Sequence, residues 1–172
     1  MSAQRGMTLP ELLVALCVVG LLVAMTAGAS VAWVERQAAR SAVYEVHAHL
    51  QVARTQAARS NRFCRFVLDP PNRLVRVLDL NDASDPSDDI ELASVTLSPR
   101  VRFARPDSVA AVTLAPLAGG LYQATFAADG SVSSGTGEVA LEGGDGYYKL
   151  ALYAAGGVQA ERWSGGAWVA GP

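Results

Sequence analysis

Hydrophobic and polar positions divide the 172-residue chain into three stretches with different periods. After a short polar start, the residues from 12 to 34 are mostly apolar and none of them is charged. About 20 such residues are enough to cross the hydrocarbon core of a bilayer. From 35 to 60, apolar residues recur at spacings of three and four, which predicts that a helix continues as an amphipathic one. The helix would have about 50 residues in all and would stop at Asn61.

The apolar stripe of the second helical stretch is narrow and rich in alanine, which favours close packing against a sheet. After residue 61 the period changes to two, and short runs alternate with turns that contain glycine or proline. This pattern predicts an α+β fold in which one long helix packs on antiparallel sheets. The predicted strands are 62–68, 73–80, 90–97, 100–104, 109–114, 121–127, 138–141, 147–154, 158–163 and 167–169. The last two flank Ser164-Gly165-Gly166 and read as a terminal hairpin that Trp163 and Trp168 would pack.

The N-terminal stretch has three interpretations. A secretory signal peptide would use Arg5 as its basic region and would be cut after Ala29, but Glu11 intrudes where its apolar region begins. A plain membrane anchor explains the length of the apolar run but not the residues that precede it. The third interpretation rests on the string Gly6-Met7-Thr8-Leu9-Pro10-Glu11-Leu12-Leu13.

That string resembles the class III signal of type IV pilins and pseudopilins. It departs from the usual pattern at Met7, where Phe is commoner, and at Pro10, where Ile, Leu or Val is commoner. The resemblance implies that a prepilin peptidase cuts between Gly6 and Met7 on the cytoplasmic side and methylates the new amino group of Met7. The chain would then consist of a leader (1–6), a transmembrane or filament-core half-helix (7–34), an amphipathic half-helix (35–61) and a β-rich head (62–172).

Glu11 is the residue of this segment that most needs an explanation, because a charged side chain inside a membrane is costly and tends to be functional. After cleavage it would be the fifth residue of the chain, and its carboxylate could pair with the N-terminal ammonium of a neighbouring subunit. A second role is compatible with the first: Thr8 and Glu11 have the spacing of a helix capping box. The resemblance implies that this stretch unwinds when the subunit enters the filament, and Gly20 and Gly28, which lower helix stability, are the expected bounds of the melted segment.

Three segments of the head and late helix resemble the GspH/FimT family, whose members are minor pseudopilins of type II secretion systems or minor pilins of type IV pili. They are 51–61, 126–131 with the strand 138–141, and 148–158. The resemblance implies a type IV pilin fold and a structural subunit at or near the tip of a pseudopilus or pilus. The subunit would begin as a single-pass inner-membrane protein with its head in the periplasm. Its partners would be the prepilin peptidase, the major and other minor pseudopilins or pilins, and the inner-membrane assembly platform.

Charge argues against DNA as the main partner. The net charge is −2, and residues 62–172 contain nine basic and thirteen acidic residues. Arg100, Arg102 and Arg105 nevertheless form a short basic run, with Arg100 and Arg102 expected on one face of a strand. The alternative function is therefore a pilus-associated DNA receptor for natural transformation, although phosphate binding needs a net basic surface.

The sequence offers little for catalysis, so we expect no enzyme and no cofactor. The two histidines, His47 and His49, would point about 200° apart on a helix and could not share a metal, and the region 135–140 only mimics a dinucleotide-binding fingerprint. The two cysteines, Cys17 and Cys64, would lie about 70 Å apart if the chain between them is helical, too far for a disulfide. An acidic run does not have the spacing of a calcium-binding EF-hand and reads as a solvated loop; its members are Asp79, Asp82, Asp85, Asp88, Asp89 and Glu91.

Overall fold

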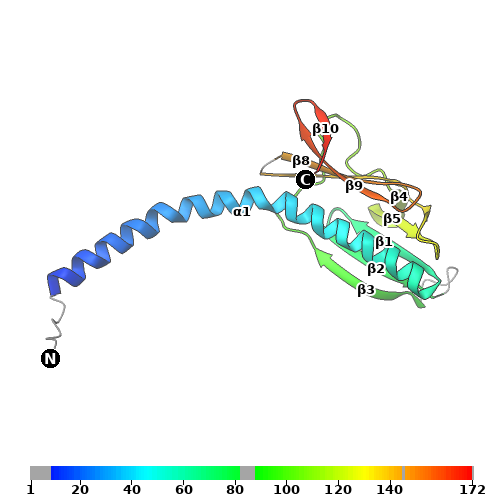
Figure 1. Ribbon diagram of the computed structural model, residues 1–172, viewed down its shortest axis with the longest axis horizontal. Coiled ribbons are helices and arrows are strands. Elements are labelled where there is room, and N and C mark those ends of the chain that lie inside the picture. The colour runs from blue at the N-terminus through cyan, green and yellow to red at the C-terminus, as the bar shows by residue number, and fades with distance from the viewer. Residues whose placement is uncertain (1–8, 82–87, 145, 172) are drawn as a thin grey trace. The chain divides into compact units, whose positions relative to one another are not determined.

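The computed structural model describes residues 9–81, 88–144 and 146–171 (Figure 1). It divides the chain into two units, Met1–Val34 and Glu35–Pro172. Helix α1, Leu9–Ser60, contributes residues to both units. All strands of the described residues belong to the second unit. From here on, the head means this whole unit, residues 35–172, so that it includes the part of α1 from Glu35 to Ser60.

Helix α1 contains 52 residues, and its ends follow the rules for helix termini. Pro10 lies in the first turn, where its missing N–H leaves no intrahelical bond unmade. Glu11 lies in the first turn and Arg59 in the last, the signs of charge that the helix dipole favours at each end. The helix stops where Asn61 adopts a left-handed backbone with φ of 53°, which asparagine tolerates better than most residues. The predicted helix and its end are confirmed.

The part of α1 that belongs to the head, Glu35 to Ser60, which we call its head half, packs against the sheets through a stripe of small residues. Ala39, Val46, Ala53 and Ala57 have no exposed surface. At Gly143, an added Cβ would lie 2.4 Å from the Cβ of Ala39. The strand that carries Gly143 therefore approaches the helix too closely for any side chain at that position. The expectation that an alanine-rich stripe allows close packing on a sheet is confirmed.

The first sheet has six antiparallel strands in the order β3-β2-β1-β5-β4, with β6 pairing with β5 (Figure 1). A short 3-10 turn, η2 (Ala118–Gly120), connects β4 to β5. The strands are β1 (Phe63–Asp69), β2 (Leu74–Leu80), β3 (Ile90–Thr96), β4 (Ala115–Leu117), β5 (Leu121–Phe126) and β6 (Val132–Ser134).

The second sheet has four antiparallel strands in the order β10-β9-β8-β7. They are β7 (Gly137–Gly143), β8 (Gly146–Leu152), β9 (Val158–Ser164) and β10 (Ala167–Ala170). The hairpin between β9 and β10 turns through Gly165 and Gly166, both with positive φ (61° and 91°). Two consecutive positive φ values are what a tight two-residue hairpin turn requires. The predicted terminal hairpin is confirmed.

One hydrophobic cluster joins α1 to the inner faces of both sheets. Its largest fully buried side chains include Phe66 on β1, Phe126 on β5 and Tyr148 on β8. A helix and two sheets that share one core are a stable solution for burying the apolar face of each element. The predicted α+β class, with a long helix packed on antiparallel sheets, is confirmed.

Two of the predicted strands, 100–104 and 109–114, are wrong. Each makes only an isolated bridge to β7, Arg102 with Glu142 and Val112 with Val139. The chain leaves β7 between these contacts, where Pro106 has no N–H to donate and Ser108 adopts a left-handed backbone with φ of 59°. Strands β4 and β6 were not predicted, because three residues are too few to establish a period of two.

Candidate functional site

The first turns of α1 carry an exposed apolar surface. Among the residues that the structure describes, no other part of the chain covers it. Ten large apolar side chains are each at least half exposed, and they lie all around the helix: Leu9, Leu12, Leu13, Val14, Leu16, Val18, Val19, Leu21, Leu22 and Val23. Within the described residues, no helix is both long and apolar enough to cross a membrane. A helix that is apolar on every side is typically buried against other chains or in lipid.

Glu11 stands at the start of this surface. It lies in the first turn of α1, its side chain is exposed, and no other charged residue follows before Glu35. A carboxylate in the first turn is favoured by the helix dipole, which contributes less than about 1 kcal/mol at an exposed site. The dipole therefore explains why a helix tolerates Glu11, but it does not explain a carboxylate beside an otherwise apolar surface.

The other predicted residues of the N-terminal signal are only partly placed. Gly6, Met7 and Thr8 lie outside the described residues, so cleavage, methylation and capping stay predictions. Gly20 and Gly28 both lie inside the continuous helix α1. A Cβ added at Gly20 would meet nothing within 4 Å, so packing within the chain does not require glycine there. Melting between the two glycines stays a prediction.

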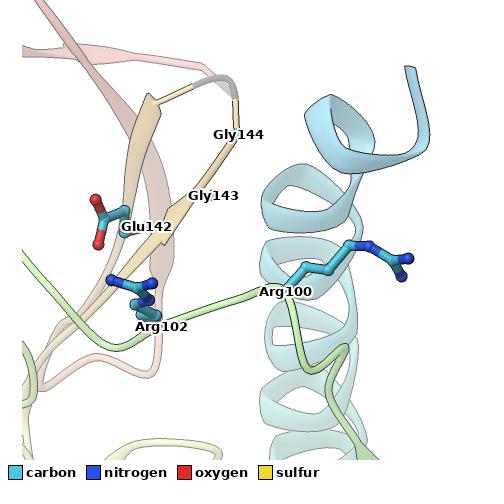
Figure 2. A pocket seen from close by; sticks show the side chains of 5 residues that line it. All are labelled: Arg100, Arg102, Glu142, Gly143 and Gly144. Atoms are coloured by element: carbon cyan, nitrogen blue, oxygen red, sulfur yellow. The ribbon is translucent and has the colours of Figure 1, made fainter. Parts of the chain in front are cut away.

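Arg100 and Arg102 line a small polar pocket of about 230 Å³ with Glu142, Gly143 and Gly144. Figure 2 shows that Arg102 points toward Glu142, whereas the side chain of Arg100 extends in a different direction. The expectation that both lie on one face of a strand is wrong, because this segment forms no strand. A carboxylate beside Arg102 also weakens any attraction for phosphate.

Arg105 belongs to a network of charged side chains on the outer face of the second sheet. Lys149 on β8 lies 2.9 Å from Glu138 on β7 and 2.9 Å from Glu161 on β9. Arg105 pairs with Glu138 and, at 2.7 Å, with Asp107. Only 5% of the Arg105 side chain and 9% of the Lys149 side chain are exposed. Arg105 is thus not available to DNA, and the three arginines do not form one basic surface.

Trp168 on β10 completes this network. Its indole N–H donates to Asp107 at 3.0 Å, and the charged ends of Lys149 and Arg105 lie 4.9 Å and 5.4 Å from its ring centroid. Such cation–π contacts are attractive. Trp163 meets Trp168 edge-on, with ring centroids 5.2 Å apart. The two tryptophans pack the terminal hairpin, as predicted. The network also holds the hairpin and the loop around residue 105 against the outer face of the second sheet.

This network was not predicted, although the sequence contains one signal for it. Lys149 is the only lysine of the chain and stands in the middle of an apolar strand. A buried lysine is rare unless it is paired, so carboxylates on the neighbouring strands were to be expected. The partner in the loop, Arg105, is 33 residues away from Glu138 and could not have been paired from the sequence.

The network shifts the pKa values of its members toward their charged forms. Hydrogen bonds from Arg105 and Trp168 hold the pKa of Asp107 well below its ordinary value. Burial alone would raise the pKa of Glu138, but hydrogen bonds from Lys149 and Arg105 outweigh it and lower that pKa. Burial likewise opposes the charge of Lys149, but hydrogen bonds to Glu161 and Glu138 raise its pKa.

These shifts predict that the head loses stability in acid through Asp107. Its ordinary pKa is 3.8 and its folded-state pKa is lower, so the unfolded chain binds more protons in this range and stability falls as the pH falls. The contribution is complete above about pH 5 and is lost below the ordinary pKa. We expect Asp107→Asn to be less stable than the wild type at pH 6, and the difference to shrink as the pH approaches 3. Urea unfolding followed by tryptophan fluorescence measures it, and an unchanged difference at pH 3 would contradict the assignment.

Arg54 on α1 connects the three segments that resemble the GspH/FimT family. Its Nε donates to the carbonyl oxygen of Gly130 at 3.1 Å and its Nη2 to that of Ala155 at 3.3 Å. Gly130 lies in the turn between β5 and β6, and Ala155 lies between β8 and β9. The guanidinium therefore holds turns from both sheets against the helix.

The same turns are crowded around Gly156, which leads to a second prediction. Gly156 has φ of 77°, and a Cβ there would lie 2.0 Å from the carbonyl oxygen of Gly130 and 2.9 Å from the Nε of Arg54. We expect Gly156→Ala to lower the free energy of unfolding of the head by about 1–3 kcal/mol. The adjacent Gly157 is the control, because a Cβ there would meet nothing within 4 Å. Equal effects of the two substitutions in urea unfolding would contradict the prediction.

The remaining candidate metal-binding and nucleophilic residues do not come together in a site. No group of three or more histidine, cysteine or acidic side chains that could hold a metal occurs in the described part of the chain, while Asp82 and Asp85 of the acidic run lie outside it. Cys17 is exposed and Cys64 buried, and both are free thiols. Burial, aided by the nearby carboxylate of Asp79, raises the pKa of Cys64 to about 11. Its thiol is therefore inert at neutral pH.

Comparisons with known proteins agree with this architecture. The family model described as type II transport protein GspH matches residues 42–156, and the prokaryotic N-terminal methylation motif matches residues 1–27. The structure of the minor pseudopilin EpsH from the type 2 secretion system of Vibrio cholerae is similar, with a TM-score of 0.50 at 14% identity, over 72% of this chain and 95% of that chain. No curated protein matches the sequence.

The matched regions account for the parts of the molecule described above. The methylation motif covers the exposed apolar turns of α1, and the GspH match covers α1 from residue 42 onward and the strands β1 to β8. The motif and the family together indicate a membrane-anchored subunit, and both the family and the fold are those of structural pseudopilins. The chain belongs to the GspH family of type II transport proteins, and it is a pilin-like minor pseudopilin of a type II secretion system.

Proposed function

We propose that the chain is a structural subunit at or near the tip of the secretion pseudopilus, into which its N-terminal helix packs. The observation that carries this proposal is the exposed apolar surface of α1 with Glu11 in its first turn. Packing the helix against those of other subunits would remove this surface from water, and apolar burial is the main favourable term in protein association. The head has its own hydrophobic core, which includes none of this exposed surface.

The route to this position begins in the inner membrane. The precursor would span the membrane once with its head in the periplasm, and a prepilin peptidase would cut between Gly6 and Met7 and methylate the amino group of Met7. The inner-membrane assembly platform would then move the subunit into the filament. There it would contact the major and the other minor pseudopilins.

Glu11 would then set the position of the helix. As the fifth residue of the cut chain, it could reach the N-terminal ammonium of a neighbouring subunit. An unpaired charge in an apolar filament core is strongly unfavourable, so only the register that pairs the two charges is stable. A polar residue in an otherwise apolar coiled-coil seam specifies register in the same way.

Cross-linking in secreting cells tests the proposal. A photoreactive residue in place of Leu16, whose side chain is exposed, is expected to link the chain to another pseudopilin. The matched control carries the same residue in place of Val169 on β10, which is also exposed but lies in the head. Links from Leu16 only to lipid or to unrelated proteins would contradict the proposal.

A further inference from the structure

A guanidinium and a carboxylate lie side by side in the small polar pocket at the end of β7 without forming an ion pair. The backbones of Arg102 and Glu142 exchange two hydrogen bonds, of 3.0 and 2.7 Å. Residues paired in this way point to the same face of a sheet, and Figure 2 shows Arg102 directed toward Glu142. In the parts of the head that the structure describes, however, neither side chain forms an ion pair with the other or with a third residue.

Both charged groups can be reached from solvent. Arg102 is exposed and Glu142 is half-buried. Tyr147, which is opposite Glu142 on β8, donates its hydroxyl to Oε1 of Glu142 at 3.2 Å and so leaves the second carboxylate oxygen for a ligand. The pocket has a volume of about 230 Å³, below the 300–1,000 Å³ that is usual for sites of drug-sized ligands. It therefore suits a small polar group.

One charge of each sign favours a ligand that itself carries both charges close together. A purely anionic ligand, such as a DNA phosphate, would be attracted by Arg102 and repelled by Glu142, and a simple cation would meet the opposite balance. A zwitterion makes two attractive contacts instead. Guanidinium groups bind phosphate through paired N–H donors, and a carboxylate accepts hydrogen bonds from a primary ammonium. Phosphoethanolamine joins these two groups through two carbon atoms.

The position of the pocket indicates the source of such a group. An added Cβ at Gly143, which lines the pocket, would lie 2.4 Å from the Cβ of Ala39, so the pocket is beside the second turn of the head half of α1. Ala39 follows Val34, the last residue of the uncharged apolar run, by five residues, or about 8 Å along a helix. The headgroup region of a bilayer is about 5–8 Å thick on each side. With the apolar run in a membrane, lipid headgroups are therefore within reach of the pocket.

We propose that the head binds the headgroup of phosphatidylethanolamine in this pocket, with the phosphate on Arg102 and the ammonium on Glu142. Arg100 is exposed and also lines the pocket, so it adds a second positive charge. This inference rests on the proposed function in one respect, namely that the precursor spans the membrane with its head in the periplasm. The bound lipid would hold this end of the head at the membrane surface until the subunit enters the pseudopilus.

Native mass spectrometry of the full chain in detergent micelles, with one added lipid at a time, tests the proposal. We expect phosphatidylethanolamine to be retained better than phosphatidylglycerol, which has no ammonium, and better than phosphatidylcholine, whose ammonium has no N–H. Arg102→Gln is expected to lower the retention of phosphatidylethanolamine at least about tenfold. Glu142→Gln is expected to remove its advantage over phosphatidylglycerol. The controls Arg162→Gln and Glu91→Gln remove one exposed charge each on β9 and β3, and retention should stay unchanged.

Three results would overturn the proposal. They are equal retention of the three lipids, retention that neither pocket variant lowers, and failure of excess soluble phosphoethanolamine to displace the lipid. The last result would show that acyl chains on the apolar turns of α1 hold it. Urea unfolding checks that each variant is folded. Arg102→Lys keeps the charge and is expected to retain more lipid than Arg102→Gln, which separates a lost contact from a lost fold.

The lipid measurements need no pseudopilus, so the two proposals can fail separately. Loss of headgroup selectivity together with normal cross-links from Leu16 to another pseudopilin would remove the lipid site and leave the proposed function intact. Selective retention of phosphatidylethanolamine by a chain that gives no such cross-links would remove the proposed function and leave the lipid site.

Discussion

Replacing Glu11 by alanine is expected to abolish incorporation of the chain into the pseudopilus and to leave its insertion in the membrane intact. The substitution removes the one charge beside the exposed apolar surface of α1, so insertion into lipid becomes no less favourable. In the filament it leaves the ammonium of a neighbouring subunit without its partner. Removing one partner of a buried ion pair costs about 3–5 kcal/mol, which corresponds to a loss of incorporation of at least about a hundredfold.

The measurement is the amount of the chain that co-purifies with the pseudopilus, relative to the amount in the membrane fraction. Glu45→Ala is the matched control, because it removes the same charge from the same helix at a position in the head half. Glu11→Gln removes the charge of the side chain but keeps its size. We expect this variant to be excluded from the pseudopilus as Glu11→Ala is. Normal co-purification of the Glu11→Ala variant would contradict the assigned role of the carboxylate.

Replacing Lys149 by alanine is expected to destabilise the head as strongly as the loss of a large core side chain would. Lys149 is almost fully buried and lies between the carboxylates of Glu138 and Glu161. Without it, Glu161 loses its ion-pair partner and Glu138 keeps only Arg105. Breaking a buried ion pair on one side costs about 3–5 kcal/mol, and we expect that loss in the free energy of unfolding. The contact of the ammonium with Trp168 is lost as well.

Urea unfolding of the head, residues 35–172, measures this loss, because this unit contains the entire hydrophobic core. Arg162→Ala is the control, since this arginine is exposed and such substitutions usually change stability by less than about 0.5 kcal/mol. The triple variant Lys149→Met, Glu138→Gln, Glu161→Gln removes the carboxylates together with the lysine and is expected to recover part of the loss. A Lys149→Ala head as stable as the control would show that the ion pairs contribute little.

The sequence was most informative where one pattern covers many residues. The spacing of three and four from 35 to 60 predicted a helix whose end at Ser60 the structure matches, because a left-handed Asn61 stops it. The hairpin around Gly165 and Gly166 was predictable because tight turns need residues that accept positive φ. The signal around Glu11 was predictable because it is a contiguous string, and the methylation motif matches it.

Long-range pairing was less predictable. The segment around Arg102 and Arg105 alternates like a strand, but its position is set by ion pairs and backbone contacts with β7, more than 30 residues away. Arg105 looked like a surface residue in sequence and is buried in the structure.

The mass of the mature N-terminus, measured on the chain isolated from membranes of its own cells, shows whether the chain is processed as a pseudopilin. The account predicts a chain that lacks residues 1–6 and begins with a methylated Met7, which makes Glu11 its fifth residue. A chain that begins at Ser30, as a secretory signal peptide would leave it, or one that keeps Met1, would contradict the account.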